Sequence, residues 1–182
     1  MAKLYINQPE LGPQKTFLTD DVAADATSST VENNDGFADD DYVVFGKVGE
    51  ERTEIVQLTG VTNEETLDHT TGPTFAHEVD TPVTQIDYNQ VNIARATTKT
   101  GTYSSVTTID LDLDQDQTTY HDQDGSSTSW YKVRYYNSTA QTYSSYSAPI
   151  QAIGYTSDSL GGMRELVFYE VNDDFADVYK EA

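Results

Sequence analysis

The segment WYKVRYYN, which begins at Trp130, constrains the fold of this chain more than any other stretch. Tyr131, Val133 and Tyr135 alternate in it with charged or more polar side chains. Successive side chains of a β-strand point to opposite faces of the sheet, so this period of two predicts a strand with one buried face. We therefore expect Tyr131 and Val133 in the hydrophobic core of an all-β unit.

Turn-forming residues flank this strand on both sides. The run from Asp122 to Gly125 precedes it, and Asp bonds its own backbone while Gly tolerates a positive φ. A polar loop, residues 139–147, follows the strand. Pro149 then biases the residue before it toward the β conformation, which restarts an extended segment. Residues 117–152 are thus predicted to form strand, turn, strand, loop and strand.

Three groups of residues give this stretch a recognisable pattern: Thr118, Tyr120 and Asp122; Trp130, Tyr131, Val133, Tyr135 and Asn137; and Ser144, Tyr146, Ser147 and Pro149. The pattern resembles the last half of a fibronectin type III domain. The resemblance implies a shortened β-sandwich of that type over residues 85–154. It implies no particular function, because that fold carries many unrelated functions.

A second series of strand and turn signals lies between residues 26 and 84. Residues 42–48 and 52–61 are strand-like and flank Gly49, which predicts a hairpin. The order of features is TSSTVENNDGF, DYVVFG, GEERTEIV, then an Ala-His pair and a closing Pro-Val. This order resembles a small β-barrel module that recurs in structural proteins of tailed viruses. That module usually has Arg-Gly after its third strand, and Asp68-His69 takes its place here, so no role of Arg-Gly carries over.

The charge balance limits the partners of the chain. Asp and Glu number 31 against 10 Lys and Arg, which gives a formal net charge of −21. Nucleic acids and anionic membranes are bound through Lys and Arg, so we expect this chain to bind neither. The spread of acidic residues, the few lysines and the absence of cysteine resemble proteins of extreme halophiles. A merely acidic mesophilic protein is the alternative.

The chain contains no apolar stretch with the length of a signal peptide or a membrane span. We therefore expect it to be made as a soluble protein in the cytoplasm.

Both ends of the chain lack the apolar content for a core of their own. Residues 1–19 predict an extended arm with one strand near Lys3–Ile6, and residues 155–182 predict a second arm. A three- and four-residue spacing of apolar residues after Met163 favours a short helix in the second arm. We expect the arms and two aromatic residues to contact neighbouring subunits. The candidate subunit contacts are Leu4, Tyr5, Ile6, Trp130, Tyr136, Leu166, Val167, Phe168 and Tyr169.

The sequence offers no clear set of catalytic, cofactor-binding or metal-binding residues. His69, His77 and His121 lie far apart and no cysteine accompanies them, whereas zinc ligands come at short, fixed spacings. No nucleophile elbow or glycine-rich phosphate loop is present. A pair of catalytic carboxylates carries no local signature, but small β modules leave little room for a deep cleft. We therefore expect a protein that is not an enzyme and needs no cofactor.

Asp110, Asp112 and Asp114 alternate with apolar residues and predict an acidic ladder on the outer face of a half-buried strand. A calcium loop of the EF-hand type would need Gly and Glu where Gln117 and Gln123 occur, counting from Asp112. The ladder is therefore interpreted as a solvated face, and weak cation binding stays open.

These observations predict an all-β protein with four parts: an N-terminal arm (1–19), a β-barrel-like module (20–84), a fibronectin type III-like module (85–154) and a C-terminal arm (155–182). By resemblance we expect a non-enzymatic virion structural protein of a tailed virus that infects a halophilic archaeon, assembled in the host cytoplasm.

Within the virion we expect a homo-oligomeric ring subunit of the head–tail connector, or neck, that contacts portal, capsid or tail proteins. A capsid decoration protein and a tail or fibre component are the alternatives from the same class. A different alternative is an adhesive module that binds glycans through Trp130 and exposed tyrosines.

Overall fold

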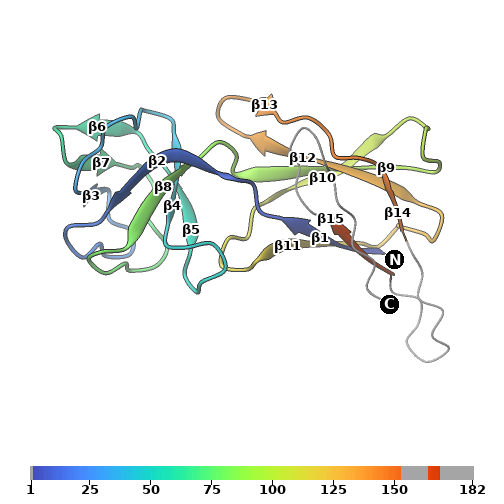
Figure 1. Cartoon of the computed structure of the whole chain (residues 1–182), viewed down its shortest axis with the longest axis horizontal. Coiled ribbons are helices and arrows are strands. Elements are labelled where there is room, and N and C mark those ends of the chain that lie inside the picture. The colour runs from blue at the N-terminus through green and yellow to red at the C-terminus, as the bar shows by residue number, and fades with distance from the viewer. Residues whose placement is uncertain (1, 153–163, 169–182) are drawn as a thin grey trace. The chain divides into compact units, whose positions relative to one another are not determined.

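The computed structural model describes residues 2–152 and 164–168, and in these ranges all regular secondary structure is β-strand (Figure 1). The prediction of an all-β fold is thereby confirmed. None of the described residues belongs to a helix long and apolar enough to cross a membrane. The chain divides into two compact units. Unit 1 comprises Met1–Pro9, Gln90–Leu111 and Gln117–Ala182, and unit 2 comprises Glu10–Asn89 and Asp112–Asp116.

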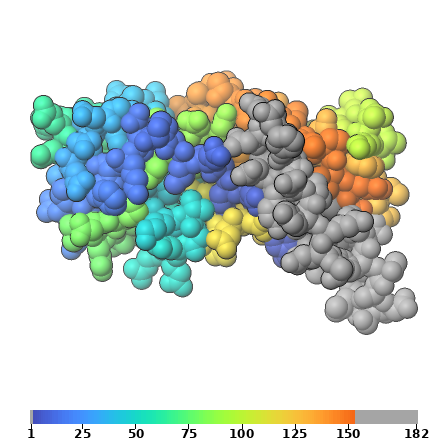
Figure 2. All heavy atoms as spheres, viewed as in Figure 1, coloured from blue at the N-terminus to red at the C-terminus, as the bar shows by residue number. Residues whose placement is uncertain are grey.

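Unit 2 contains two antiparallel sheets. The larger sheet has the order β2 (Leu11–Phe17), β8 (Pro82–Ile86), β4 (Tyr42–Phe45) and β5 (Glu54–Gln57). The smaller sheet has the order β3 (Ser28–Thr30), β7 (Thr66–Asp68) and β6 (Gly60–Thr62). Figure 2 shows the segments of residues 10–89, coloured from blue to green, packed against one another. No closed barrel forms among the described residues of this unit, so the barrel-like module is a pair of open sheets.

Strand β4 lies in the core of unit 2. All four residues of β4 are buried, and Val43 and Phe45 pack with Leu67 of β7 and Val83 of β8. The predicted hairpin exists, because β4 and β5 pair antiparallel and Gly49 in their connection has a φ of 84°. A side chain would be strained at that φ, which explains glycine there.

Unit 1 also contains two sheets. One has the order β11 (Gln117–Asp122), β1 (Ala2–Asn7) and β15 (Arg164–Phe168). The other has the order β10 (Ser104–Asp110), β9 (Gln90–Ala96), β12 (Trp130–Asn137) and β13 (Thr142–Tyr143), and β14 (Ile150–Gln151) also pairs with β12. The β1–β11 pair is antiparallel, whereas β1 and β15 run parallel.

The burial of β12 follows the alternation of its sequence. Tyr131 and Val133 are fully buried and Tyr135 nearly so, whereas the residues between them are partly exposed. The prediction that Tyr131 and Val133 belong to the core is therefore confirmed. On β1, Leu4 and Ile6 are also fully buried.

The N-terminal residues do not form the predicted arm. Residues 2–7 form β1, the middle strand of a sheet in unit 1, and residues 11–17 form β2 in unit 2. The predicted module boundary at residue 19 therefore differs from the division that the structure has. Leu4 and Ile6 are apolar because they fill the core of their own unit.

The alternative of a C-terminal helix is wrong for residues 164–168, which form strand β15 beside β1. Met163 and residues 169–182 lie outside the described residues. Val167 is β-branched and Phe168 is aromatic, and both residue types favour strands. Pairing with β1 therefore outweighs the weak helical spacing of apolar residues.

The acidic ladder is only partly a strand. Strand β10 ends at Asp110, and residues 112–116 belong to unit 2. Leu111 and Leu113 are buried, as the alternation predicts, while Asp110 and Asp112 are exposed.

Candidate interaction site

The outward side of β12 carries four large side chains in a row. Trp130, Lys132, Arg134 and Tyr136 alternate with the buried residues of this strand and are each partly exposed. On the adjacent β9 their register partners are Ala96, Ala94, Asn92 and Gln90. Since paired residues of neighbouring strands share a face, small and amide side chains lie beside the large ones.

The guanidinium of Arg134 lies against two tyrosine rings. Its Cζ atom is 3.6 Å from the ring centre of Tyr143 and 4.4 Å from that of Tyr146. The Tyr143 ring also stacks on Tyr136, with 4.4 Å between ring centres and 25° between planes. Tyr143 and Tyr146 nevertheless remain 45% and 39% exposed. The negative face of an aromatic ring attracts a cation, so both tyrosine rings stabilise the position of the Arg134 guanidinium. Part of each ring remains open to solvent.

Asn92 fixes the side chains of Arg134 and Tyr146 through hydrogen bonds. Its Oδ1 atom accepts a hydrogen bond from Nε of Arg134 at 3.2 Å and one from the hydroxyl of Tyr146 at 3.4 Å. Its Nδ2 atom donates to Oγ of Ser105 at 2.8 Å and to Oγ1 of Thr108 at 3.0 Å. Asn92 is only 3% exposed, so a buried amide fixes the orientation of the Arg134 side chain.

Two lysines extend the row toward Trp130. Lys132 lies with its Nζ atom 4.6 Å from the ring centre of Tyr103, and Lys99 lies 5.7 Å from that of Trp130. We call the set of eight residues the cation–aromatic face. Its members are Lys99, Tyr103, Trp130, Lys132, Arg134, Tyr136, Tyr143 and Tyr146. Trp, Tyr and Arg are the residue types enriched where proteins contact one another.

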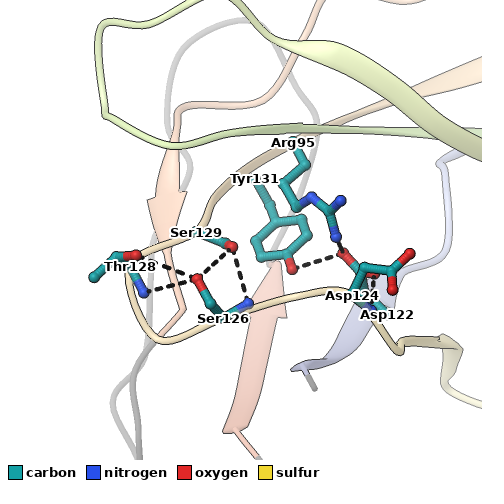
Figure 3. A network of polar contacts seen from close by, with 7 residues as sticks. All are labelled: Arg95, Asp122, Asp124, Ser126, Thr128, Ser129 and Tyr131. Atoms are coloured by element: carbon teal, nitrogen blue, oxygen red, sulfur yellow. Dashed lines mark hydrogen bonds and ion pairs between the residues drawn. The ribbon is translucent and has the colours of Figure 1, made fainter.

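A polar network lies on the inward side of the same strands (Figure 3). Nη1 of Arg95 is 2.6 Å from Oδ2 of Asp122, and the hydroxyl of Tyr131 donates to the same oxygen at 2.8 Å. The backbone N–H of Asp124 donates to Oδ1 of Asp122 at 3.1 Å. Burial, and then the bond to the Asp122 carboxylate, raise the pKa of Tyr131 far above its ordinary value. The phenol therefore stays protonated and serves as a fixed donor.

The turn before β12 is shaped to fit this network. A Cβ atom on Gly125 would lie 2.3 Å from the hydroxyl oxygen of Tyr131, which leaves room only for glycine. Oγ of Ser126 lies 3.1 Å from Oγ of Ser129 and 3.2 Å from Oγ1 of Thr128, and these bonds close the turn (Figure 3). We interpret the network as structural, because its members bond one another and fix the turn before β12.

Two buried histidines of unit 2 lie next to Phe45. The ring centres of His69 and His77 are 6.1 Å and 5.3 Å from that of Phe45. Nε2 of His77 is 3.0 Å from Oε1 of Glu54, whereas neither ring nitrogen of the fully buried His69 has a hydrogen-bond partner in the structure. Burial lowers the pKa of His69, and the nearby Ala26 backbone, which does not reach hydrogen-bonding geometry with the ring, and the charge of Asp68 offset part of that effect.

The carboxylate of Glu54 is fixed by several donors. Besides His77 it accepts bonds from the backbone N–H groups of Thr74 and Phe75 at 2.6 Å and 2.9 Å. Burial alone would raise the pKa of Glu54, but these hydrogen bonds lower it. Across the described part of the chain, no three His, Asp or Glu residues come together in a group that could hold a metal ion.

The described subunit-contact candidates fall into two groups, one on β12 and one on the paired strands β1 and β15. Trp130 and Tyr136 lie on one face of β12, whereas Leu4 and Ile6 are buried in unit 1 and cannot reach a partner while that unit is folded. Tyr5 is partly exposed and contacts Lys3.

Three further predicted contacts lie in β15. The backbones of Leu166, Val167 and Phe168 pair in register with residues 4–6, and Tyr169 lies outside the described residues. These backbone positions extend the three-stranded sheet and do not form a free arm.

Most residues of the cation–aromatic face were not predicted as contacts from the sequence. The alternation on β12 already places Lys132 and Arg134 on the face of Trp130, and this signal was available. Tyr143 lies in the short strand β13 and Tyr146 in the loop after it, and the sequence does not indicate the path of either segment.

Comparisons with protein-family models, with curated proteins and with solved structures found no match to this chain.

Proposed function

We propose that this chain is a non-enzymatic structural protein of a tailed-virus virion that assembles with copies of itself. The observation that carries the assembly role is the cation–aromatic face. It is partly exposed and contains four Tyr, one Trp and one Arg, and hydrogen bonds to Asn92 hold Arg134 and Tyr146 in place. Such preorganised side chains lose little freedom on binding, which favours a contact surface.

The virion setting is supported by the sequence of unit 2. The features that resemble the tailed-virus module occur within one compact unit, with β3, β4 and β5 in the expected order and His77 shortly before the closing Val83. Within a virion, we propose a ring subunit of the head–tail connector that contacts portal, capsid or tail proteins. A capsid decoration protein and a tail or fibre component are the alternatives.

A glycan-binding adhesive module is the second candidate, and the exposure of Tyr143 and Tyr146 favours it. A neutral sugar can pack the C–H groups of one of its faces against an exposed aromatic ring. The cation–aromatic face, however, is the outward side of a sheet, and small ligands prefer concave sites.

Antibody labelling of virus particles tests the proposal. An antibody raised against the purified protein is applied to particles from cells that carry this gene, and gold-labelled particles are examined by electron microscopy. Label at the junction of head and tail supports a connector, whereas label over the head or along the tail supports the corresponding alternative. Particles that carry no label, and that lack the chain by mass spectrometry of their disrupted proteins, would overturn the virion role.

A further inference from the structure

We infer that the cation–aromatic face binds an acidic surface of a second copy of this chain, so that copies associate head to tail. The inference rests on the proposed function for its setting, and it names the surface and the chemistry through which subunits would recognise each other. Four observations carry it: unpaired cations, the acidity of the rest of the chain, the like charge of two such faces, and the preorganised guanidinium of Arg134.

The cations of this face form no ion pair with any carboxylate in the described part of the chain. Among the described residues the ion pairs are Lys47–Glu50, His77–Glu54 and Arg95–Asp122. Lys99, Lys132 and Arg134 lie over aromatic rings instead. Lys3 and Lys15 also lie over aromatic rings, so what distinguishes this face is that three cations gather on it in a chain with 31 acidic and 10 basic residues. This group of cations is complementary to an acidic surface.

The chain itself supplies such a surface. Asp39, Asp40 and Asp41 form its one run of three consecutive acidic residues, in the connection between β3 and β4 of unit 2. Asp39 and Asp40 are exposed, and Asp41 is partly exposed. On the face side of the sheet the carboxylate of Asp110 is bonded to Gln90 at 2.7 Å, so a second copy offers further carboxylates to the cations. We infer that the run Asp39–Asp41 of one copy meets the cation–aromatic face of the next.

The charges also determine the symmetry of the contact. Two identical cation–aromatic faces would bring Lys99, Lys132 and Arg134 against their own counterparts, and like charges across an interface are unfavourable. The face must then meet a different surface of its neighbour. Such a heterologous contact forms a closed ring if the rotation between copies closes, and a filament if it does not.

Arg134 is prepared for a carboxylate. Its Nε atom is occupied by Asn92, and its flat faces contact Tyr143 and Tyr146. Its two terminal nitrogens donate no hydrogen bond to any described residue. A guanidinium in this state presents two parallel donors, which match the two oxygens of a carboxylate. Arg and Tyr residues that become buried when two proteins associate contribute most of the binding energy in many protein interfaces.

The first test measures the oligomeric state of the full chain by light scattering coupled to size-exclusion chromatography, in dilute buffer and in concentrated KCl. We expect the unmodified chain to form oligomers and Lys132→Glu to raise the dissociation constant by about tenfold or more, since 1.4 kcal/mol corresponds to a factor of ten. The matched control is Lys47→Glu, which makes the same change of charge at an exposed lysine of unit 2. Each variant is checked for an unchanged circular dichroism spectrum and melting temperature.

The second test locates the partner surface. Unlabelled and nitrogen-15-labelled chains are mixed and treated with a carbodiimide, which joins a lysine amine to a carboxylate as an amide with loss of water. Mass spectrometry then identifies cross-links between a labelled and an unlabelled peptide. We expect Lys99 and Lys132 of one copy to be linked to Asp39, Asp40 or Asp41 of another, and these links to disappear in an Asp39→Asn, Asp40→Asn, Asp41→Asn triple variant.

Other outcomes would overturn the inference. Oligomers that Lys132→Glu leaves unchanged, with no cross-link from Lys99 or Lys132 between copies, would mean that self-association uses another surface. A chain that stays monomeric in all conditions would also contradict it. A monomer that binds a carboxylated oligosaccharide, and loses it with Lys132→Glu but not with Lys47→Glu, would assign the face to a glycan. None of these results decides the virion role, which the labelling of particles tests separately.

Discussion

Arg95 and Asp122 join the two sheets of unit 1 through an ion pair with 2.6 Å between Nη1 and Oδ2. Arg95 lies on β9 of one sheet and Asp122 on β11 of the other. The Asp122 side chain is 3% exposed and that of Arg95 29%, so one end of the pair is buried and the other reaches solvent. Tyr131 donates to the same carboxylate oxygen, which makes Asp122 the common acceptor of two strands.

Replacing Asp122 by Asn should destabilise unit 1 strongly. The variant removes the charge that Arg95 and Tyr131 both use, and breaking a buried pair from one side costs about 3 kcal/mol. Urea unfolding followed by the fluorescence of Trp130 measures this, because Trp130 is the one tryptophan of the chain and lies in unit 1. Asp124→Asn is the control, since Asp124 is exposed and its loss should stay within about 0.5 kcal/mol. Equal effects of the two variants would contradict the structural role of the ion pair.

Acidification should destabilise unit 2 through His69. The pKa of this buried imidazole is lowered from its ordinary value of 6.5, so the unfolded chain binds a proton more readily than the folded one. The contribution of neutral His69 to the free energy of unfolding is therefore complete above pH 6.5. This contribution is lost as the pH falls below 6.5 toward the lower pKa of the folded state. Amide hydrogen exchange of β4, which is buried in unit 2, measures the loss.

Two variants separate His69 from other titrating groups. His69→Leu should flatten the pH dependence in this window and leave stability at neutral pH similar or higher, since it removes two buried nitrogens without partners. His121→Gln, at an exposed residue of unit 1, should change nothing in unit 2. Glu54 adds a separate loss below its ordinary pKa of 4.5, because its pKa is lowered in the folded state. An unchanged acid response in His69→Leu would contradict the assignment.

The strands that the sequence predicts well are those with a strong local pattern. The alternation around Val133 and the turn at Gly49 each predict a feature that the structure contains. Strand β1 was misinterpreted, because its role depends on pairing with β11, whose residues lie more than half the chain away. Local pattern shows that residues 3–6 are extended, but it does not indicate which strand they join.

The candidate site shows the same limit. Alternation places Trp130, Arg134 and Tyr136 on one face, whereas the position of Tyr143 against Arg134 depends on the course of a loop. The buried anchor Asn92 comes from another strand of the sheet, and only the register of β9 with β12 brings it beneath Arg134. Such contacts between residues distant in sequence carry no signal in a single chain.

The two sides of β12 should respond differently to truncation. Val133 is fully buried, so Val133→Ala should cost about 1–3 kcal/mol through lost packing and a cavity. Lys132 is partly exposed on the opposite side, and Lys132→Ala should stay within about 0.5 kcal/mol. Urea unfolding of the monomer, followed by Trp130 fluorescence, compares the two. Similar small effects from both variants would contradict the burial pattern of β12.

Concentrated salt should stabilise the folded chain. A net charge of −21 makes acidic groups repel one another in the compact state, and salt screens this repulsion with a Debye length of about 3 Å at 1 M. We expect the melting temperature, measured by circular dichroism, to rise strongly between dilute buffer and molar KCl. The same series in sorbitol at matched water activity is the control for effects that do not depend on charge. A melting temperature that does not respond to KCl would argue against the halophilic interpretation.

The N-terminal strand should be essential for the folding of unit 1. Leu4 is fully buried in β1, between Tyr120 of β11 and the backbone of Leu166 in β15. Leu4→Ala should therefore cost about 2–5 kcal/mol, as large-to-small changes at buried leucines do. Leu11 is the matched control, because it is 37% exposed at the start of β2, and Leu11→Ala should cost less than about 1 kcal/mol.

Deletion of residues 1–9 should have a larger effect than either substitution, because it removes the middle strand of the sheet and exposes the core that Leu4 and Ile6 fill. We expect this truncated chain to lose the Trp130 emission typical of folded unit 1, while amide exchange in β4 still reports a protected unit 2. An arm that only contacts a neighbouring subunit would give the opposite result, with Trp130 emission and melting temperature unchanged and only the oligomer lost. That outcome would mean that β1 contributes to assembly and not to the core of its own unit.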